Sequence, residues 1–304
     1  MRDFLLVTGA NGYLGAACVQ RLAGMAGPSV LAVWHKGRDR LLPAPPAHVH
    51  YKHCDLADRT EVAKLFSEYQ IGAVAHTAAL LPDGQPCFLT RALKTNAQVT
   101  LNLADALRES GCGRFIYCSS ISIYASAPCP PGGWPELESL APAHEYGWSK
   151  FVGEECVRLC CQPGGISGVA LRFAGIHGPG RRSGVLFNTI TAALAGKPIQ
   201  LNNARQPFQM VFLDDAVSAV LSAVRVPLAT SFERVNVASY TFGSLQELAC
   251  RIVSACGSTS RVDSGPSTGA VQIMSTARMA TVLAMGPGDV ERLLRDTIRW
   301  TSSL

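Results

Sequence analysis

A phenol, an ammonium group and a hydroxyl are spaced in this sequence so that they could move a proton on a substrate oxygen. Tyr146 and Lys150 stand four residues apart in a helical pattern, so both side chains lie on one helical face. A cation close to a tyrosine stabilises the phenolate and makes the phenol a usable acid or base near neutral pH. Ser120 ends an apolar strand pattern and could hydrogen-bond the same oxygen. These three residues form the predicted catalytic group.

A glycine-rich turn near the amino terminus is the second candidate site. The first apolar run, residues 4–7, is interpreted as a strand, and it enters a turn over residues 8–15 that opens a helical pattern. Glycines in such a unit let the backbone approach a pyrophosphate, and the helix N-terminus offers free N–H groups to its charge. We expect a dinucleotide to contact this turn through Gly9, Asn11, Gly12, Tyr13, Leu14 and Gly15.

The residues after the second predicted strand bear on which dinucleotide would bind. A carboxylate at this place normally accepts hydrogen bonds from the adenosine ribose, whereas a basic residue suits a 2′-phosphate. Here His35, Lys36 and Arg38 precede the first acid, Asp39. The sequence therefore favours NADP(H) over NAD(H) as the cofactor. The alternative is that Lys36 and Arg38 are solvated loop charges and that either cofactor is accepted.

The composition sets limits on the class of protein. With 304 residues, 48% of them hydrophobic and 16% charged, the chain can bury a sizeable core, which excludes a disordered protein. The net charge of +5 is not concentrated in a basic run, so we expect neither a nucleic-acid nor a membrane partner. The longest nearly apolar stretch, Ile71 to Leu81, is far shorter than the roughly 20 residues of a membrane-spanning helix. We expect a cytoplasmic protein that acts on a small molecule.

The cysteines and histidines do not indicate a metal site. Eleven cysteines are an odd number without a Cys-x-x-Cys pair, which favours reduced core thiols in a cytosol-like compartment. The thiols expected in apolar segments include Cys18, Cys118, Cys156, Cys160, Cys161 and Cys250. His48, His50, His53 and Cys54 lack a second ligand pair, so we expect no metal.

Short β-type runs alternate with longer helical patterns along most of the chain, which is typical of βαβ units. The sequence predicts an α/β protein with a doubly wound parallel sheet of about seven strands and a smaller C-terminal substrate lobe. The expected strands are Phe4–Thr8, Ser29–Trp34, His48–His53, Ala73–Thr77, Arg114–Ser119, Gly168–Phe173 and Phe208–Leu213. Helices are expected to begin near Gly12, Asp58, Phe88, Tyr146 and Asp214.

The chain is expected to divide into two parts. Residues 1–175 and 208–240 would form the dinucleotide-binding domain, and residues 176–207 and 241–304 the substrate-binding lobe. Long loops, which often carry function, are expected at Leu42–Ala47, Pro128–Pro135 and Gly175–Gly184. Near the C-terminus, Val290, Leu293, Leu294, Thr297 and Ile298 follow the spacing of an amphipathic helix.

Together these motifs resemble the extended short-chain dehydrogenase/reductase family, which includes NAD-dependent epimerases and dehydratases of sugar nucleotides. The likeness covers nearly the whole chain. The glycine-rich turn matches Gly9, Gly12 and Gly15, and the catalytic serine, tyrosine and lysine match Ser120, Tyr146 and Lys150. Further matches are Asp55-Leu56, His76-Thr77-Ala78-Ala79, Asn96, Ser119 to Tyr124, Leu171-Arg172-Phe173, Gly178-Pro179-Gly180 and Leu213 to Ala216.

The resemblance implies a Rossmann fold and a hydride passed between a substrate carbon and the nicotinamide while Tyr146 moves the proton on oxygen. Ser120 would orient that oxygen, and Lys150 would bind the nicotinamide ribose and keep Tyr146 acidic. Tyr124 is expected to pack at the floor of the crevice, with a substrate contact as the alternative. Cofactor contacts are also implied for Asp55, Leu56, Thr77, Ala78, Ala79 and Asn96.

The sequence departs from the family where a substrate diphosphate would bind. Members that bind sugar nucleotides carry an asparagine and an arginine at the positions of Gly175 and Phe208. Neither residue here offers an amide or a cation, which favours a small, non-nucleotide substrate. Arg181, Arg182 and Arg205 lie nearby in the sequence and could substitute. Other residues that could line a less charged pocket, or else pack as core, are Trp134, Phe187, Phe208 and Met210.

Three functions remain open. The first is an NADP(H)-dependent reductase of a ketone or aldehyde, or the reverse alcohol oxidation. The second is a sugar-nucleotide 4-epimerase that holds NAD tightly. A dehydratase is least expected, because it needs an additional acid beside Ser120 and this chain has no carboxylate there. The third is a non-catalytic cofactor-binding regulator. Family members often form homodimers through helices that would correspond to Phe88–Leu107 and Tyr146–Cys161, although simple packing on the sheet also explains their apolar residues.

Overall fold

A seven-stranded parallel sheet forms the centre of the larger body in the computed structural model, which describes residues 4–37, 40–111, 113–124, 129–137, 140–162, 165–266 and 271–304. Its strands are β1 (Phe4–Thr8), β2 (Ser29–Trp34), β3 (Val49–His53), β4 (Ile71–His76), β5 (Gly113–Ser120), β6 (Ile166–Phe173) and β10 (Phe232–Val237). They lie in the order β10-β6-β5-β4-β1-β2-β3. The strand order therefore reverses between β1 and β4, where such sheets bind ligands.

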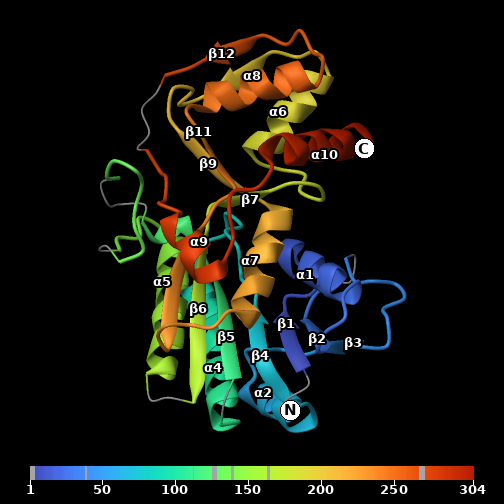
Figure 1. The fold of residues 1–304 in the computed structure, drawn as a ribbon, viewed down its shortest axis with the longest axis vertical. Coiled ribbons are helices and arrows are strands. Elements are labelled where there is room, and N and C mark those ends of the chain that lie inside the picture. The colour runs from blue at the N-terminus through green and yellow to red at the C-terminus, as the bar shows by residue number, and fades with distance from the viewer. Residues whose placement is uncertain are drawn as a thin grey trace.

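Helices cover both faces of this sheet, which explains the continuous apolar runs of its central strands (Figure 1). One face carries α1 (Tyr13–Ala23), α7 (Leu213–Arg225) and α9 (Ala277–Leu283). The other face carries α2 (Arg59–Glu68), α4 (Gln98–Glu109) and α5 (Glu145–Cys161). Short helical segments are α3 (Phe88–Ala92), the π-helical turn η1 (Leu93–Ala97) and the 3-10 turn η2 (Ile121–Ile123). The predicted α/β fold with a doubly wound sheet is confirmed.

A smaller lobe lies above the large sheet in Figure 1 and contains the C-terminus. One small sheet, in the order β11-β9-β7, contains β7 (Gly175–His177), β9 (Phe208–Phe212) and β11 (Tyr240–Phe242). A second sheet pairs β8 (Ile199–Leu201) with β12 (Val262–Ser264). The helices around them are α6 (Val185–Leu194), α8 (Leu245–Ala255) and α10 (Val290–Ser302). Leu293, Leu294 and Thr297 of α10 are buried, which confirms the predicted amphipathic helix.

Two element predictions were wrong. The strand expected at Phe208–Leu213 joins the small sheet as β9, and the seventh strand of the large sheet is β10. This edge strand alternates apolar residues with Glu233, Arg234 and Asn236, so it lacks the apolar run that marks the central strands. The loop expected over Gly175–Gly184 begins with the short strand β7. The division into two domains stays a prediction.

The described cysteines and histidines do not gather at a common site. All ten described cysteines are free, and Cys250 is exposed on α8, contrary to its expected place in the core. His53 Nε2 lies 3.0 Å from the carbonyl oxygen of His35, while His48 Nε2 lies 3.3 Å from that of Leu22. Within the described ranges no three potential metal ligands converge, and no helix is long and apolar enough to cross a membrane.

His76, at the end of β4, is buried and hydrogen-bonded on both ring nitrogens. Nδ1 lies 2.8 Å from Thr8 Oγ1 and Nε2 lies 3.2 Å from Thr100 Oγ1. Because Thr100 donates its own proton to the carbonyl of Asn96, it accepts from Nε2–H of His76. With the ring proton on Nε2, Nδ1 accepts from the hydroxyl of Thr8, whose oxygen also accepts the amide N–H of Ala78. The ring is thus held neutral, and burial lowers its pKa to about 3.

We expect the free energy of unfolding to fall as the pH drops from 6.5 towards 3. In this window the unfolded imidazole binds a proton that buried His76 does not, so acid favours the unfolded chain. The loss approaches about 1.4 kcal/mol per pH unit. His177, whose pKa burial lowers to about 4, should add to it.

Urea unfolding at pH 7, 6, 5 and 4, followed by circular dichroism, measures this slope. His76→Gln should flatten the slope, whereas His50→Gln, at an exposed position, should leave it as in the wild type. Identical slopes for the wild type and His76→Gln would contradict the assignment of a buried neutral imidazole.

Candidate functional site

A cavity of about 950 Å³ opens at the carboxyl ends of β1, β2, β4 and β5. Its wall is formed by the start of α1, by the segments that follow these strands and β3, and by the loop after β7. The predicted residues that line it are Gly9, Asn11, Gly12, Tyr13, Leu14, His35, Lys36, Asp55, Leu56, Thr77, Ala78, Ala79, Asn96, Ser120, Tyr146, Lys150 and Gly175. The structure therefore brings together segments that are up to 166 residues apart in the sequence.

The glycines of the turn allow its backbone to lie close to neighbouring segments and to a ligand. Gly9 has a φ of +63°, and a Cβ there would lie 2.9 Å from the backbone of Ala78. A Cβ on Gly15 would lie 2.2 Å from the carbonyl oxygen of Gly9, so Gly15 permits close packing of α1 and does not itself line the cavity. Gly12 is the N-cap residue just before α1, and no side chain caps that helix. This arrangement is the cradle that a pyrophosphate requires.

The far end of the cavity is bounded by the segments after β2 and β3. The side-chain amide of Asn11 donates to the carbonyl of Lys36 and, at 3.3 Å, to that of Gly37. His35 Nε2 lies 4.0 Å from the carboxylate of Asp55. Lys36 is exposed at the rim, while Arg38 lies outside the described residues. The geometry suits an adenosine between these segments, and Lys36 is a described cation that lines this end of the cavity.

Lys150 is buried beside Tyr146 on α5. Its Nζ donates to the carbonyl of Cys118 over 2.8 Å and lies 5.9 Å from the centre of the Tyr146 ring. Burial lowers the pKa of Lys150 to about 8, and burial raises the pKa of Tyr146 above its usual value. The expectation that Lys150 brings the pKa of Tyr146 down was wrong for the protein alone, because desolvation outweighs a cation at this distance. Tyr146 in the protein alone is therefore a neutral phenol that carries its proton.

Ser120 and Asn96 form hydrogen bonds that fix the segments next to Tyr146 and Lys150. Ser120 Oγ accepts the amide N–H of Ser122 over 3.1 Å at the end of β5. Asn96 lies in η1, where its Oδ1 accepts the N–H of Leu80 over 2.6 Å and its Nδ2 donates to Ser149 Oγ over 3.1 Å. Asn96 thus uses its side chain to tie the segment after β4 to α5.

The expected substrate residues do not all reach the cavity. Gly175 lines it, but Phe208 packs beside His177, with ring centres 6.3 Å apart, and Phe187 packs near Trp300, at 6.2 Å. Tyr124 is fully buried, so the substrate alternative for it is wrong and its packing interpretation holds. Trp134 and Met210 are likewise core residues rather than cavity walls.

Cations that the sequence did not single out, or only noted as neighbours, line the cavity. Arg40 Nη2 donates to the carbonyl of Gly180 over 3.4 Å, and its guanidinium lies 5.9 Å from the ring centre of Tyr13. Arg181 and Arg182 line the same cavity from the loop after β7. The sequence signal for Arg40 is its position four residues after Lys36, but only the fold turns that loop towards α1.

The charges along the wall suit an anionic ligand. Among the described lining residues, Asp55 supplies a carboxylate, whereas the cations are Lys36, Arg40, Lys150, Arg181 and Arg182. Such an excess of positive charge raises the affinity for phosphates, which agrees with the glycine cradle at the start of α1. The residues present therefore fit a nicotinamide dinucleotide with its reactive end beside Tyr146.

Solved structures share this fold. The chain matches a UDP-glucose 4-epimerase from Thermotoga maritima solved with UDP-glucose, with a TM-score of 0.83, 22% identity and 99% coverage of both chains. It also matches a UDP-glucuronic acid 4-epimerase from Bacillus cereus solved with NAD, with a TM-score of 0.83, 20% identity and 99% coverage of both chains. At these identities the likeness shows the fold alone.

Sequence comparisons assign the family. The chain is 28% identical over 318 residues to a dTDP-4-dehydro-6-deoxy-D-allose reductase from a Streptomyces species, covering 97% of this chain and 95% of the relative. Residues 5–238 match the model of the NAD dependent epimerase/dehydratase family. That match spans most of the chain and includes the glycine cradle, Ser120, Tyr146 and Lys150. The protein therefore belongs to the NAD dependent epimerase/dehydratase family and is an NAD(P)-dependent oxidoreductase of the extended short-chain dehydrogenase/reductase type.

Proposed function

We propose that the protein is an NADP(H)-dependent reductase of a ketone or aldehyde, with Tyr146 as the acid that protonates the substrate oxygen. The observation that carries this proposal is the placement of Ser120, Tyr146 and buried Lys150 together at the wall of a dinucleotide-sized cavity. Reduction of a carbonyl needs a proton donor to the oxygen, and the phenol of Tyr146 can serve as that donor. A nicotinamide cofactor, when bound, supplies the hydride.

Each residue of the catalytic group then has one task. Ser120 Oγ hydrogen-bonds the carbonyl oxygen and orients it towards Tyr146. Tyr146 donates its proton as negative charge develops on that oxygen. The ammonium of Lys150, fixed by the carbonyl of Cys118, stabilises the phenolate that remains. The reverse sequence oxidises an alcohol, with the phenolate as base.

A carbonyl carried by a sugar nucleotide is the substrate class that the surroundings support best. The preference for a non-nucleotide substrate rested on Gly175 and Phe208, but Phe208 does not line the cavity, so its missing charge carries little weight. Arg181 and Arg182 do line it and can neutralise a diphosphate. The Streptomyces relative is a reductase of a dTDP-4-dehydro-6-deoxy sugar, which supports the same choice.

A panel assay tests this function. Purified protein is mixed with NADPH or NADH and either a dTDP-4-dehydro-6-deoxy sugar or a small ketone, and the absorbance at 340 nm is followed. Reduction consumes one NADPH per carbonyl. A 4-epimerase, the second candidate, would interconvert UDP-glucose and UDP-galactose without net consumption, and the solved epimerases of this fold make that control necessary.

We expect Tyr146→Phe to lower kcat by at least about 100-fold, because the proton donor is lost while the ring remains. The affinity for NADPH, measured by fluorescence titration, should stay within about twofold. Tyr69→Phe, outside the cavity, is the matched control and should keep full activity. Unchanged turnover in Tyr146→Phe with every accepted substrate would overturn the mechanism.

The proposed preference for NADPH rests on Lys36, the first described cation after β2. We expect Lys36→Ala to raise the KM for NADPH about tenfold and the KM for NADH less than twofold, because only NADPH carries a 2′-phosphate. Lys64→Ala, exposed on α2 and outside the cavity, should change neither constant. Equal effects on both cofactors would mean that Lys36 does not read the 2′ position.

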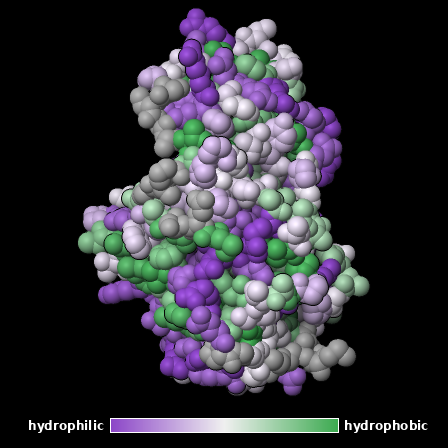
Figure 2. All heavy atoms as spheres, turned by 60° about the vertical axis from the view of Figure 1, so that its left-hand side comes forward, coloured by the Kyte–Doolittle hydropathy of each residue, from purple (hydrophilic) through white to green (hydrophobic). Residues whose placement is uncertain are grey.

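We also propose a homodimer through the outer surface of α5 and the neighbouring α3. Trp148 and Leu159 of α5 are eleven residues apart, three helical turns, so they share one face, and both are exposed together with Leu89 of α3. Figure 2 turns this side forward and shows apolar residues gathered on the broader body of the molecule. A dimer formed through this face would remove these apolar side chains from water.

Analytical ultracentrifugation at about 10 μM should give the dimer mass, and Leu159→Arg should shift it towards the monomer, because a charge buried at an interface is costly. Leu194→Arg, at another exposed apolar position, on α6, should leave the mass unchanged. A wild-type monomer at this concentration would refute the proposed dimer.

A further inference from the structure

Three consecutive residues at the end of β5 are each hydrogen-bonded to α5. Tyr117 Oη donates to the carbonyl of Lys150 over 3.3 Å, and Lys150 Nζ donates to the carbonyl of Cys118 over 2.8 Å. Ser119 Oγ then donates to Glu154 Oε2 over 3.0 Å. These bonds join the strand that ends in Ser120 to the helix that carries Tyr146, immediately beside both residues.

The helix approaches the strand too closely for a side chain at Gly153. A Cβ there would lie 2.2 Å from the hydroxyl oxygen of Tyr117. The contact between α5 and β5 is therefore direct, so a small displacement of the helix would move the catalytic tyrosine relative to the strand. The bond between Ser119 and Glu154 lies one helical turn beyond Lys150 and resists such a displacement.

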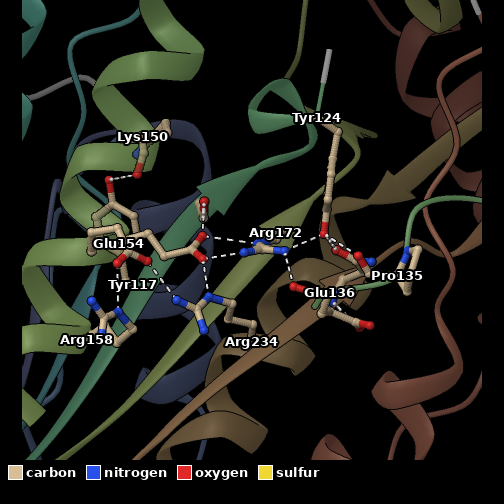
Figure 3. A network of polar contacts seen from close by, with 12 residues as sticks. Tyr117, Tyr124, Pro135, Glu136, Lys150, Glu154, Arg158, Arg172 and Arg234 are labelled. Atoms are coloured by element: carbon tan, nitrogen blue, oxygen red, sulfur yellow. Dashed lines mark hydrogen bonds and ion pairs between the residues drawn. The ribbon is translucent and has the colours of Figure 1, made fainter. Parts of the chain in front are cut away.

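Glu154 is fully buried and fully hydrogen-bonded, as Figure 3 shows. Besides Ser119, its carboxylate accepts from Arg172 Nε over 3.1 Å, from Arg172 Nη2 over 2.5 Å and from Arg234 Nε over 2.8 Å. Two guanidinium groups thus fix both carboxylate oxygens. A buried carboxylate held in this way has one position, whereas an unpaired one would be strongly unfavourable.

Arg172 extends this network away from α5 towards Tyr124 and Glu136 (Figure 3). Its Nη1 donates to Tyr124 Oη and, over 2.9 Å, to the carbonyl of Glu136. Tyr124 Oη donates in turn to Asn236 Oδ1 over 3.0 Å. Arg172 is therefore anchored at both ends of its guanidinium, and it can hold Glu154 in place without help from Ser119.

We propose that Glu154 is a positioning residue for the reaction: its carboxylate, fixed by Arg172, holds Ser119 and so sets the place of Ser120 against Tyr146 and Lys150. The proposal rests on the function assigned above to those three residues. If Glu154 only stabilised the fold, its ion pair with Arg172 would be enough and the hydrogen bond to Ser119 would not be needed. The hydroxyl of Ser119 adds little to the stability of a pair already anchored by two arginines, but it is one residue from the hydroxyl that orients the substrate.

Ser119→Ala tests the proposal without leaving a buried charge unpaired. We expect amide hydrogen exchange to become at least about fivefold faster at residues 146–150, while α10 stays unchanged. Ser260→Ala, a buried serine of the small lobe whose Oγ bonds Ser258, is the matched control and should leave residues 146–150 unchanged. This measurement needs no substrate. Equal exchange in the two variants would overturn the positioning role.

Kinetics with NADPH and the dTDP-4-dehydro-6-deoxy sugar give the second readout. Ser119→Ala should lower kcat about tenfold with the KM for NADPH within twofold. Glu154→Gln should lower kcat further. In the double variant the total loss of kcat should be smaller than the product of the two single losses, because both substitutions affect the same hydrogen bond between Ser119 and Glu154. Glu155→Gln, which removes the neighbouring carboxylate that also accepts from Arg234, should act independently of Ser119→Ala.

Each outcome separates the two proposals. If the wild type reduces no carbonyl but exchange at residues 146–150 responds to Ser119→Ala, the proposed function fails and the positioning contact stands. If the wild type is active and Ser119→Ala keeps kcat within twofold, the positioning role fails and the function stands. If Glu154→Gln does not fold, the two serine variants decide the question on their own.

Discussion

Burial of the Lys150 ammonium is the constraint on which the site depends. A cation removed from water is costly, and here the carbonyl of Cys118 is its described hydrogen-bond acceptor, so its pKa falls to about 8. Between pH 8 and 10.5 the unfolded chain binds a proton at this position that the folded chain does not, so raising the pH stabilises the fold. At neutral pH the buried ammonium therefore lowers the stability of the fold. In return it places a positive charge close to Tyr146, where the reaction needs it.

The two buried charges on α5, Lys150 and Glu154, differ in whether they are ion-paired. Lys150 faces the cavity and forms no ion pair with a carboxylate among the described residues, so its charge remains available to a phenolate. Glu154, one turn further along the same helix, is paired with two arginines and has no free lone pair to offer. Pairing Lys150 with a carboxylate would stabilise the fold but would also neutralise the field at Tyr146. The separation of these roles along α5 is therefore required by the chemistry.

Sequence reasoning succeeded where the information is local. The turn over residues 8–15 follows from its glycines, and the four-residue spacing of Tyr146 and Lys150 follows from helical geometry. It failed for β10, because an edge strand with Glu233 and Arg234 does not carry the apolar run of a central strand. It also failed for the raised pKa of Tyr146, since desolvation depends on how the whole chain packs around that ring.

The same reasoning missed residues whose contacts join distant segments. Arg172 meets Tyr124, which is 48 residues away, and Glu154, which is 18 residues away, and no spacing in the sequence announces either contact. Tyr124 was correctly expected to pack, but its partners followed only from the fold. Arg40 is a comparable case, because its approach to Gly180 spans 140 residues.

The cations of the cavity bear on what the substrate must carry. In the proposed binding mode, the pyrophosphate of a dinucleotide lies at the uncapped start of α1 and its adenosine end near Lys36, which leaves Arg181 and Arg182 on the opposite loop. Neither of these two arginines forms an ion pair with a described carboxylate, and both belong to the loop after β7, at the border with the small lobe. Guanidinium groups at a cavity wall without carboxylate partners favour a second anionic ligand over a neutral ketone. The charge of the wall therefore supports a substrate with phosphate groups even though the family's usual residues are absent at Gly175 and Phe208.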